Sequence, residues 1–89
     1  MLKNYELVLT NKHNFHYIEN MNRSEIISLI RERRKHLDIT QTMLAELAGV
    51  SLHTISDMES GKGNPSLDVL MSIVDTLGLE LTLTVRGIE

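Results

Sequence analysis

Two segments of helical composition, residues 41–48 and 52–59, are separated by only three residues, among them Gly49 and Ser51. A connection this short makes two helices cross steeply. Gly49 supplies the positive φ that such a turn needs, and Ser51 is a good N-cap for the second helix. Ala45 is small enough to let the helices approach where they touch. This helical pair forms the centre of the predicted fold.

Capping residues predict the other helix boundaries. Asn22 and Glu25 have the spacing of a capping box, which opens a helix that runs to about His36. Thr40 caps the segment 41–48. In the same way Ser66 opens a fourth helix, which Gly78 ends, and Gly61 ends the third. The fold class is therefore mainly α, with about four helices.

Apolar residues at helical spacing predict the buried faces of these helices. We assign to the core Ile26, Ile27, Ile30 and Leu37 in the first helix, Leu44, Ala45, Leu47 and Ala48 in the second, Ile55 and Met58 in the third, and Leu67, Leu70, Met71, Val74 and Leu77 in the fourth. Aromatic residues make up only 3% of the chain, so the core must be aliphatic. Met43, Met58 and Met71 are expected to fill space in the core or in an interface.

Both ends of the chain have strand character. Residues 5–10 and 15–18, with a turn-like cluster between them, predict a β-hairpin. Residues 79–85 alternate strictly between apolar and polar side chains. A lone amphipathic strand needs a partner, so it pairs with the N-terminal hairpin, with a second subunit, or with both. We divide the chain into an N-terminal extension (1–20), a helical domain (21–78) and a C-terminal strand (79–89).

The charge is unevenly distributed. The chain carries 9 Lys and Arg against 12 Asp and Glu, a net charge of −3, which is no nucleic-acid signature. Five of the nine cationic residues lie within residues 22–36, namely Arg23, Arg31, Arg33, Arg34 and Lys35. A cationic stripe on an acidic body is compatible with DNA binding. Arg31, Arg33 and Lys35 fit equally a solvated helix face or phosphate contacts.

A family pattern runs through residues 31–78. It comprises Thr40-Gln41, Leu44-Ala45, Ala48-Gly49-Val50-Ser51, Thr54-Ile55-Ser56, Glu59-Ser60-Gly61-Lys62 and Asn64-Pro65-Ser66-Leu67. This stretch resembles the lambda-repressor-like, or XRE-type, helix-turn-helix family. The resemblance implies a four-to-five-helix core whose third helix, residues 52–59, enters the major groove of DNA.

The resemblance also implies roles for individual residues. The residues expected to contact DNA are Thr40, Gln41, Ser51, Leu52, His53, Thr54, Ser56, Asp57 and Lys62. Arg34 and Glu59 look like the family's internal ion pair. The family often has Gln, Lys or Arg where Leu52 and Asp57 stand; Leu52 fits a thymine methyl group, and Asp57 fits cytosine N4 but repels phosphate.

The C-terminal strand narrows the resemblance, because most members of the family have a fifth helix there. A strand at this place resembles the HipB-type antitoxins, whose C-terminal strands pair across a dimer. This implies a homodimer on a palindromic operator, with Leu79, Leu81, Leu83 and Val85 as dimerisation residues, and a HipA-type kinase toxin as partner. Alternatives are a stand-alone or phage-type repressor, and a protein-interaction module that does not bind DNA.

Catalytic and metal-binding functions are not predicted. Ser51, His53 and Asp57 include the residue types of a catalytic triad, but they share one exposed segment without a pocket. His13 and His16 have the spacing of metal ligands without a third ligand. The chain has no cysteine, which excludes disulfides and thiolate metal sites. No apolar run reaches the roughly 18 residues of a membrane span, so we expect a cytoplasmic protein without cofactor.

Overall fold

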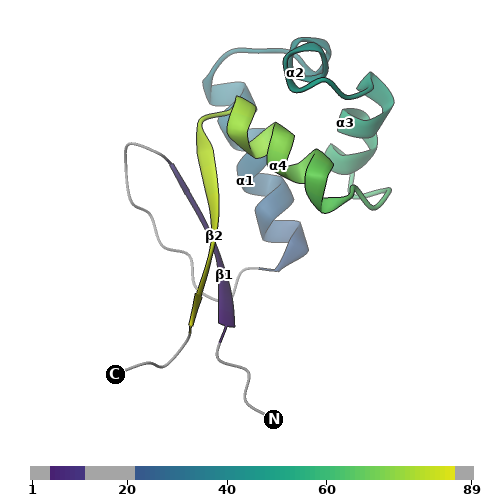
Figure 1. Ribbon diagram of the computed structural model, residues 1–89. Coiled ribbons are helices and arrows are strands. Elements are labelled where there is room, and N and C mark those ends of the chain that lie inside the picture. Colours follow the sequence, from purple (N-terminus) through teal and green to yellow (C-terminus); the bar gives the residue numbers. More distant parts are fainter. Residues whose placement is uncertain (1–4, 12–21, 86–89) are drawn as a thin grey trace.

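Four helices and a two-stranded sheet make up the fold (Figure 1). The structure, a computed structural model, describes the backbone of residues 5–11 and 22–85 and the side chains of residues 22–83. In chain order the elements are β1 (Tyr5–Asn11), α1 (Arg23–His36), α2 (Gln41–Ala48), α3 (Leu52–Glu59), α4 (Leu67–Thr76) and β2 (Leu79–Val85). The four predicted helices and the C-terminal strand are confirmed.

The predicted caps open the helices. At α1 the Asn22 side chain accepts a hydrogen bond from the Glu25 N–H, and the Glu25 carboxylate accepts one from the Asn22 N–H, which completes the capping box. Thr40, Ser51 and Ser66 cap the other three helices through their hydroxyl oxygens. These bonds satisfy N–H groups that have no partner within the helix.

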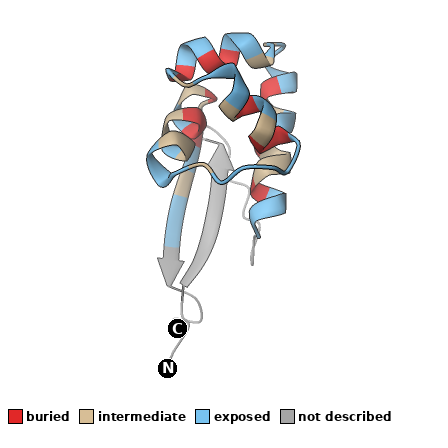
Figure 2. Cartoon of the chain, turned by 90° about the vertical axis from the view of Figure 1, so that its right-hand side faces the viewer, coloured by how far each residue is buried: buried red, intermediate tan, exposed pale blue. Residues whose placement is uncertain are grey.

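The helices pack around one aliphatic core, and Figure 2 shows buried residues on the sides of the helices that face one another. The core consists of Ile26, Ile30, Leu44, Ala45, Ala48, Ile55, Met58, Ile73, Val74, Leu77 and Leu79. Each fully buried aliphatic side chain of this kind stabilises a fold by about 1.5–3 kcal/mol. The core thus holds α3 against α1 and α2 along one side only.

Several predicted core positions are wrong. Leu47 is 66% exposed and Leu67 is 67% exposed, while Met71 and Leu37 are also exposed. In α4 the buried stripe runs through Ile73, which was not predicted. The reason is that α2 and α4 carry apolar residues on two flanks, so helical spacing alone does not select the flank that faces the core.

The two strands pair with each other. β1 and β2 run antiparallel, with Tyr5 opposite Val85 and Asn11 opposite Leu79. The C-terminal strand therefore has a partner at the N-terminal end of its own chain, which is one of the predicted pairings. Residues 15–18, the second strand of the predicted hairpin, lie outside the described residues. In Figure 1 the β1–β2 ribbon extends away from the four helices.

Candidate nucleic-acid interface

The turn between α2 and α3 sets the orientation of α3. Gly49 has φ +73°, in the left-handed region, and its N–H donates to the carbonyls of Ala45 and Glu46. The N–H of Val50 donates to the Ala45 carbonyl at 3.0 Å. From α4, the Ser72 hydroxyl donates to the Ala48 carbonyl at 2.6 Å. The last turn of α2 is therefore held by its own glycine cap and by a neighbouring helix.

Helix α3 has one buried face and one exposed face. Ile55 and Met58 lie in the core, whereas Leu52, His53 and Ser56 are exposed. Thr54 and Asp57 are half-buried at the boundary between the two faces. The exposed face thus presents one apolar and two polar side chains along a helix that is anchored from behind, which is the form that a major groove accepts.

The start of α3 is closed by its own side chains. The Ser51 hydroxyl accepts from the Thr54 N–H at 3.0 Å, and the two hydroxyl oxygens are 2.8 Å apart. Ser51 is thus engaged with Thr54. His53 instead pairs with Asp57, four residues further along the helix, and His53 Nε2 lies 3.0 Å from Asp57 Oδ2. The structure therefore does not arrange Ser51, His53 and Asp57 as a catalytic relay. The i,i+4 spacing was the signal from which the His53–Asp57 contact could have been predicted.

The ion pair implied by the resemblance joins α1 to α3. Arg34 Nε lies 2.6 Å from Glu59 Oε2, and Arg34 Nη2 lies 2.9 Å from Glu59 Oε1, a two-point contact between buried side chains. Arg34 also donates to the carbonyl of Ile39 at 2.7 Å. Such a contact fixes both the distance and the orientation of the helices that it connects.

Gln41 joins this pair, which the sequence did not predict. Its Nε2 donates to Glu59 Oε1 at 3.0 Å, so α2 is tied to the same carboxylate. Burial raises the pKa of Glu59, but the hydrogen bonds from Arg34 and Gln41 and the nearby positive charges outweigh it, and the net pKa is lowered from its ordinary value. Glu59 is therefore held ionised, and the Gln41 side chain retains its amide oxygen for another contact.

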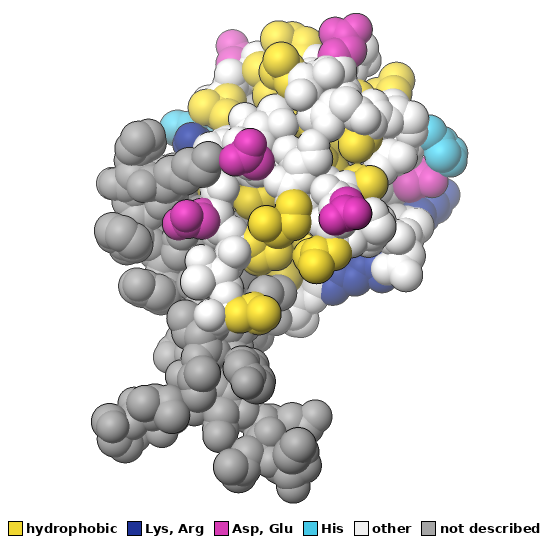
Figure 3. Space-filling view, in the orientation of Figure 1, with side chains coloured by type: hydrophobic (Ala, Val, Ile, Leu, Met, Phe, Trp, Pro, Cys, Tyr) yellow, Lys and Arg dark blue, Asp and Glu magenta, His cyan; other side chains and the backbone are white. Residues whose placement is uncertain are grey.

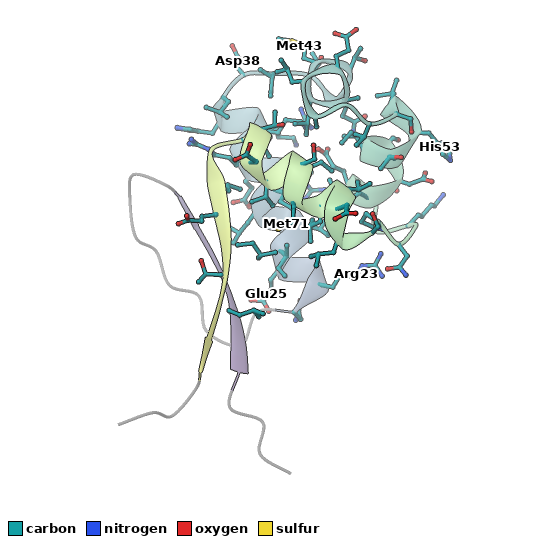
Figure 4. All side chains as sticks on the ribbon, in the orientation of Figure 1. Arg23, Glu25, Asp38, Met43, His53 and Met71 are labelled. Atoms are coloured by element: carbon teal, nitrogen blue, oxygen red, sulfur yellow. The ribbon has the colours of Figure 1, made fainter. Side chains whose placement is uncertain are left out.

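Cationic side chains flank the far end of α3. Lys62 follows the helix and is exposed, and its N–H donates to the Asp57 carbonyl at 2.8 Å. Arg23, at the start of α1, donates to the carbonyl of Gly63 in the same loop. Figure 3 shows Lys and Arg side chains at the edge of the molecule next to His, and Figure 4 labels Arg23 and His53 on that same side. The face that carries α4 instead shows hydrophobic side chains (Figure 3).

The other predicted residues fall in two places. Thr40 caps α2 and accepts from the Met43 N–H at 3.0 Å, so its hydroxyl lies at the N-terminus of that helix. Of the proposed dimerisation residues, Leu79 is buried in its own core and Leu81 packs against it, whereas Leu83 is 68% exposed. The Val85 side chain lies outside the described side chains.

The described residues also bear on metal binding and membrane insertion. No group of three or more His, Asp or Glu side chains is placed to hold a metal ion in residues 22–83. His13 and His16 lie outside the described residues. No helix in the described part of the chain is long and apolar enough to cross a membrane.

Known proteins are similar to this chain in sequence. Residues 30–83 match the helix-turn-helix family, so the chain belongs to that family. It is 47% identical over 53 residues to an uncharacterized HTH-type transcriptional regulator of Methanothermobacter thermautotrophicus, covering 60% of this chain and 77% of the relative. It is 33% identical over 64 residues to the uncharacterized HTH-type transcriptional regulator y4mF of Sinorhizobium fredii, and the match covers 72% of this chain and 84% of the relative.

A phage protein is among the relatives. The chain is 37% identical over 59 residues to the immunity repressor protein of Bacillus phage phi105, which covers 66% of this chain but only 39% of the phage protein. Most of the phage repressor therefore has no counterpart in this match.

Proposed function

We propose that the chain is a sequence-specific DNA-binding transcriptional repressor. The observation that carries this proposal is the exposed face of α3, bounded by the capped N-termini of α2 and α3 and by Lys62. Helix N-termini and cationic side chains attract phosphate, and the exposed side chains between them can reach base edges. The relatives named as transcriptional regulators and as an immunity repressor support the same function.

The proposed contacts separate into two groups. Thr40, Gln41, Ser51, Thr54 and Lys62 contact the phosphate backbone and position the protein, whereas Leu52, His53, Ser56 and Asp57 face the bases. Among the latter, Ser56 and His53 are exposed and polar, and Leu52 offers an apolar contact to a thymine methyl group. The Asp57 carboxylate accepts a hydrogen bond from cytosine N4 only if it is released from His53 or is turned away from phosphate.

A binding experiment tests this function. Binding to the duplex upstream of the chain's own gene is compared with binding to a scrambled duplex of equal composition, at several salt concentrations. We expect tighter binding to the promoter, and affinity for both that falls with salt. His53→Ala and Ser56→Arg should alter the sequence preference, while His36→Ala, an exposed histidine at the end of α1, should not. Equal binding to both duplexes would contradict sequence-specific recognition, and no binding to either duplex at low salt would favour the alternative of a protein-interaction module.

We further propose that the repressor is a homodimer. Leu83 projects from the same face of β2 as Leu79 and Leu81 but beyond the helical body, where it is exposed. A second copy that covers Leu83 would place two α3 helices about 34 Å apart on a palindromic operator. Leu83→Asp should shift the protein toward monomer in sedimentation analysis, whereas Thr82→Asp, on the opposite face of the strand, should not. A wild-type chain that binds its operator as a monomer would contradict the dimer.

The role as antitoxin to a HipA-type kinase toxin is a narrower proposal. It rests on the resemblance of the C-terminal strand to that of the HipB-type antitoxins. Purification of the chain from its native host should bring a kinase with it, and a kinase gene should lie next to its own. A neighbourhood without such a gene, and purification without such a protein, would instead indicate a stand-alone or phage-type repressor.

A further inference from the structure

A groove of about 480 Å³ lies between the first half of α1 and the C-terminal end of α3. It is lined by Arg23, Ser24, Ile27, Ser28 and Arg31 from α1 and by Met58, Glu59, Ser60 and Gly61 from the other wall. Two arginines and three serines therefore line the groove, with both arginines on the α1 wall. Hydroxyl groups and guanidinium groups are both donors to phosphate oxygens.

The one acidic residue in the groove is neutralised. The Glu59 carboxylate receives two hydrogen bonds from Arg34 and one from Gln41. Arg31 is close enough that its charge also helps to lower the pKa of Glu59. Since Arg34 already balances Glu59, the charges of Arg23 and Arg31 leave the groove net positive.

The three arginines in the second half of α1 differ in their contacts. Arg34 is committed to Glu59, and Arg33 Nε donates to the Leu77 carbonyl at 2.9 Å, toward the end of α4. Arg31 is exposed and has no hydrogen-bond or ion-pair partner among the described residues. Of these three arginines, Arg31 alone is both unpartnered within the described part and located in the groove.

The groove opens beside the proposed DNA-binding face. Ser60 and Gly61 in its wall follow α3 directly, and Lys62 comes next in the chain. Arg23 bridges the groove to the loop through the Gly63 carbonyl, and it lies on the same side of the molecule as His53 (Figure 4). A backbone strand of a duplex that holds α3 in its major groove would pass this end of the helix.

We propose that the groove between α1 and α3 binds a phosphodiester group of the DNA backbone, with Arg31 as the direct contact and Arg23 at its rim. The proposal rests on the proposed function and adds a contact from α1, outside the helix-turn-helix itself. It assigns different roles to Arg31 and Arg33, which the sequence did not separate.

The test uses the full chain and a random-sequence duplex, because phosphate contacts do not require the operator. For Arg31→Gln we expect about tenfold weaker binding at low salt. The slope of log affinity against log salt concentration should become shallower by about 0.9, the value for one lost phosphate contact. Arg33→Gln is the matched control on the same helix, and thermal unfolding is measured for both variants to correct for any loss of folded protein.

Each outcome decides the proposal. A shallower slope for Arg31→Gln and an unchanged slope for Arg33→Gln support it, and Arg23→Gln should then weaken binding in the same direction. Equal effects of Arg31→Gln and Arg33→Gln would indicate only the loss of a distant charge and overturn it, as would no change in either. These results are independent of sequence preference, so the groove and the repressor function fail separately.

A titration with inorganic phosphate distinguishes binding of a DNA phosphodiester group from binding of a free phosphate anion. In an NMR titration, the random-sequence duplex should shift the amide signals of Ser24, Ser28 and Ser60. If inorganic phosphate shifts these signals in the wild-type chain while the duplex does not, the groove takes a free anion, and the proposed DNA contact is wrong.

Discussion

Glu59→Gln should destabilise the chain strongly although it changes a single atom. Arg34 is 8% exposed and Glu59 is 7% exposed, so little water can replace the lost counter-charge. Breaking a buried ion pair on one side costs about 3–5 kcal/mol. Because glutamine keeps the shape, and Arg34 keeps its bond to the Ile39 carbonyl at 2.7 Å, we expect the lower end, about 3 kcal/mol.

Thermal and urea unfolding followed by circular dichroism measure this effect. For a domain of this size, 3 kcal/mol corresponds to a fall in Tm of about 12–24 °C. Arg34→Met should cost a similar amount, because it leaves the carboxylate buried with Gln41 as its remaining partner. The double variant Arg34→Met with Glu59→Leu removes both charges, and we expect it to stay within about 2 kcal/mol of the wild type.

Two results would refute this reasoning. A loss below about 1 kcal/mol for Glu59→Gln is the value of a solvent-exposed pair, and it would mean that water reaches the contact. A double variant whose loss equals the two single losses added together would mean that the side chains act independently, without the coupling that their contact requires.

Three further predictions concern stability. The pKa of Glu59 is lowered from its ordinary value of 4.5. The stability that the ionised Glu59 contributes is therefore fully present above pH 4.5 and is lost as the pH falls through the lowered pKa. Glu59→Gln should flatten this part of a plot of unfolding free energy against pH. Gly49→Val should cost about 1–3 kcal/mol in urea unfolding. A Cβ at Gly49 meets no atom within 4 Å, so we attribute this cost to φ +73°, and a harmless substitution would contradict the turn. Ser51→Ala should cost about 1 kcal/mol by the same assay, through loss of the cap of α3, and an unchanged midpoint would show that the cap contributes nothing.

The helix boundaries could be predicted because their signals are local. Asn22, Thr40, Ser51 and Ser66 each cap a helix within three residues of chain, and Gly49 takes the expected positive φ. Such signals depend on neighbours in sequence and not on the packing of distant segments.

Longer-range features could be predicted only in part. The alternation of residues 79–85 indicated a strand but not its partner, because period two defines faces and not pairing. Leu47 and Leu67 were assigned to the wrong side of their helices, because each helix has two apolar flanks. At the site, the contact of Gln41 with Glu59 depends on the distance between α2 and α3, which no spacing in the sequence encodes.

The antiparallel sheet connects residue 5 to residue 85, so its formation closes a loop that contains all four helices. Closing so long a loop costs conformational entropy before any strand contact forms, whereas the helices pack with near neighbours in sequence. We therefore expect the helices to assemble first and the sheet last. During synthesis on the ribosome, β1 emerges before the four helices, and its partner β2 emerges only after them.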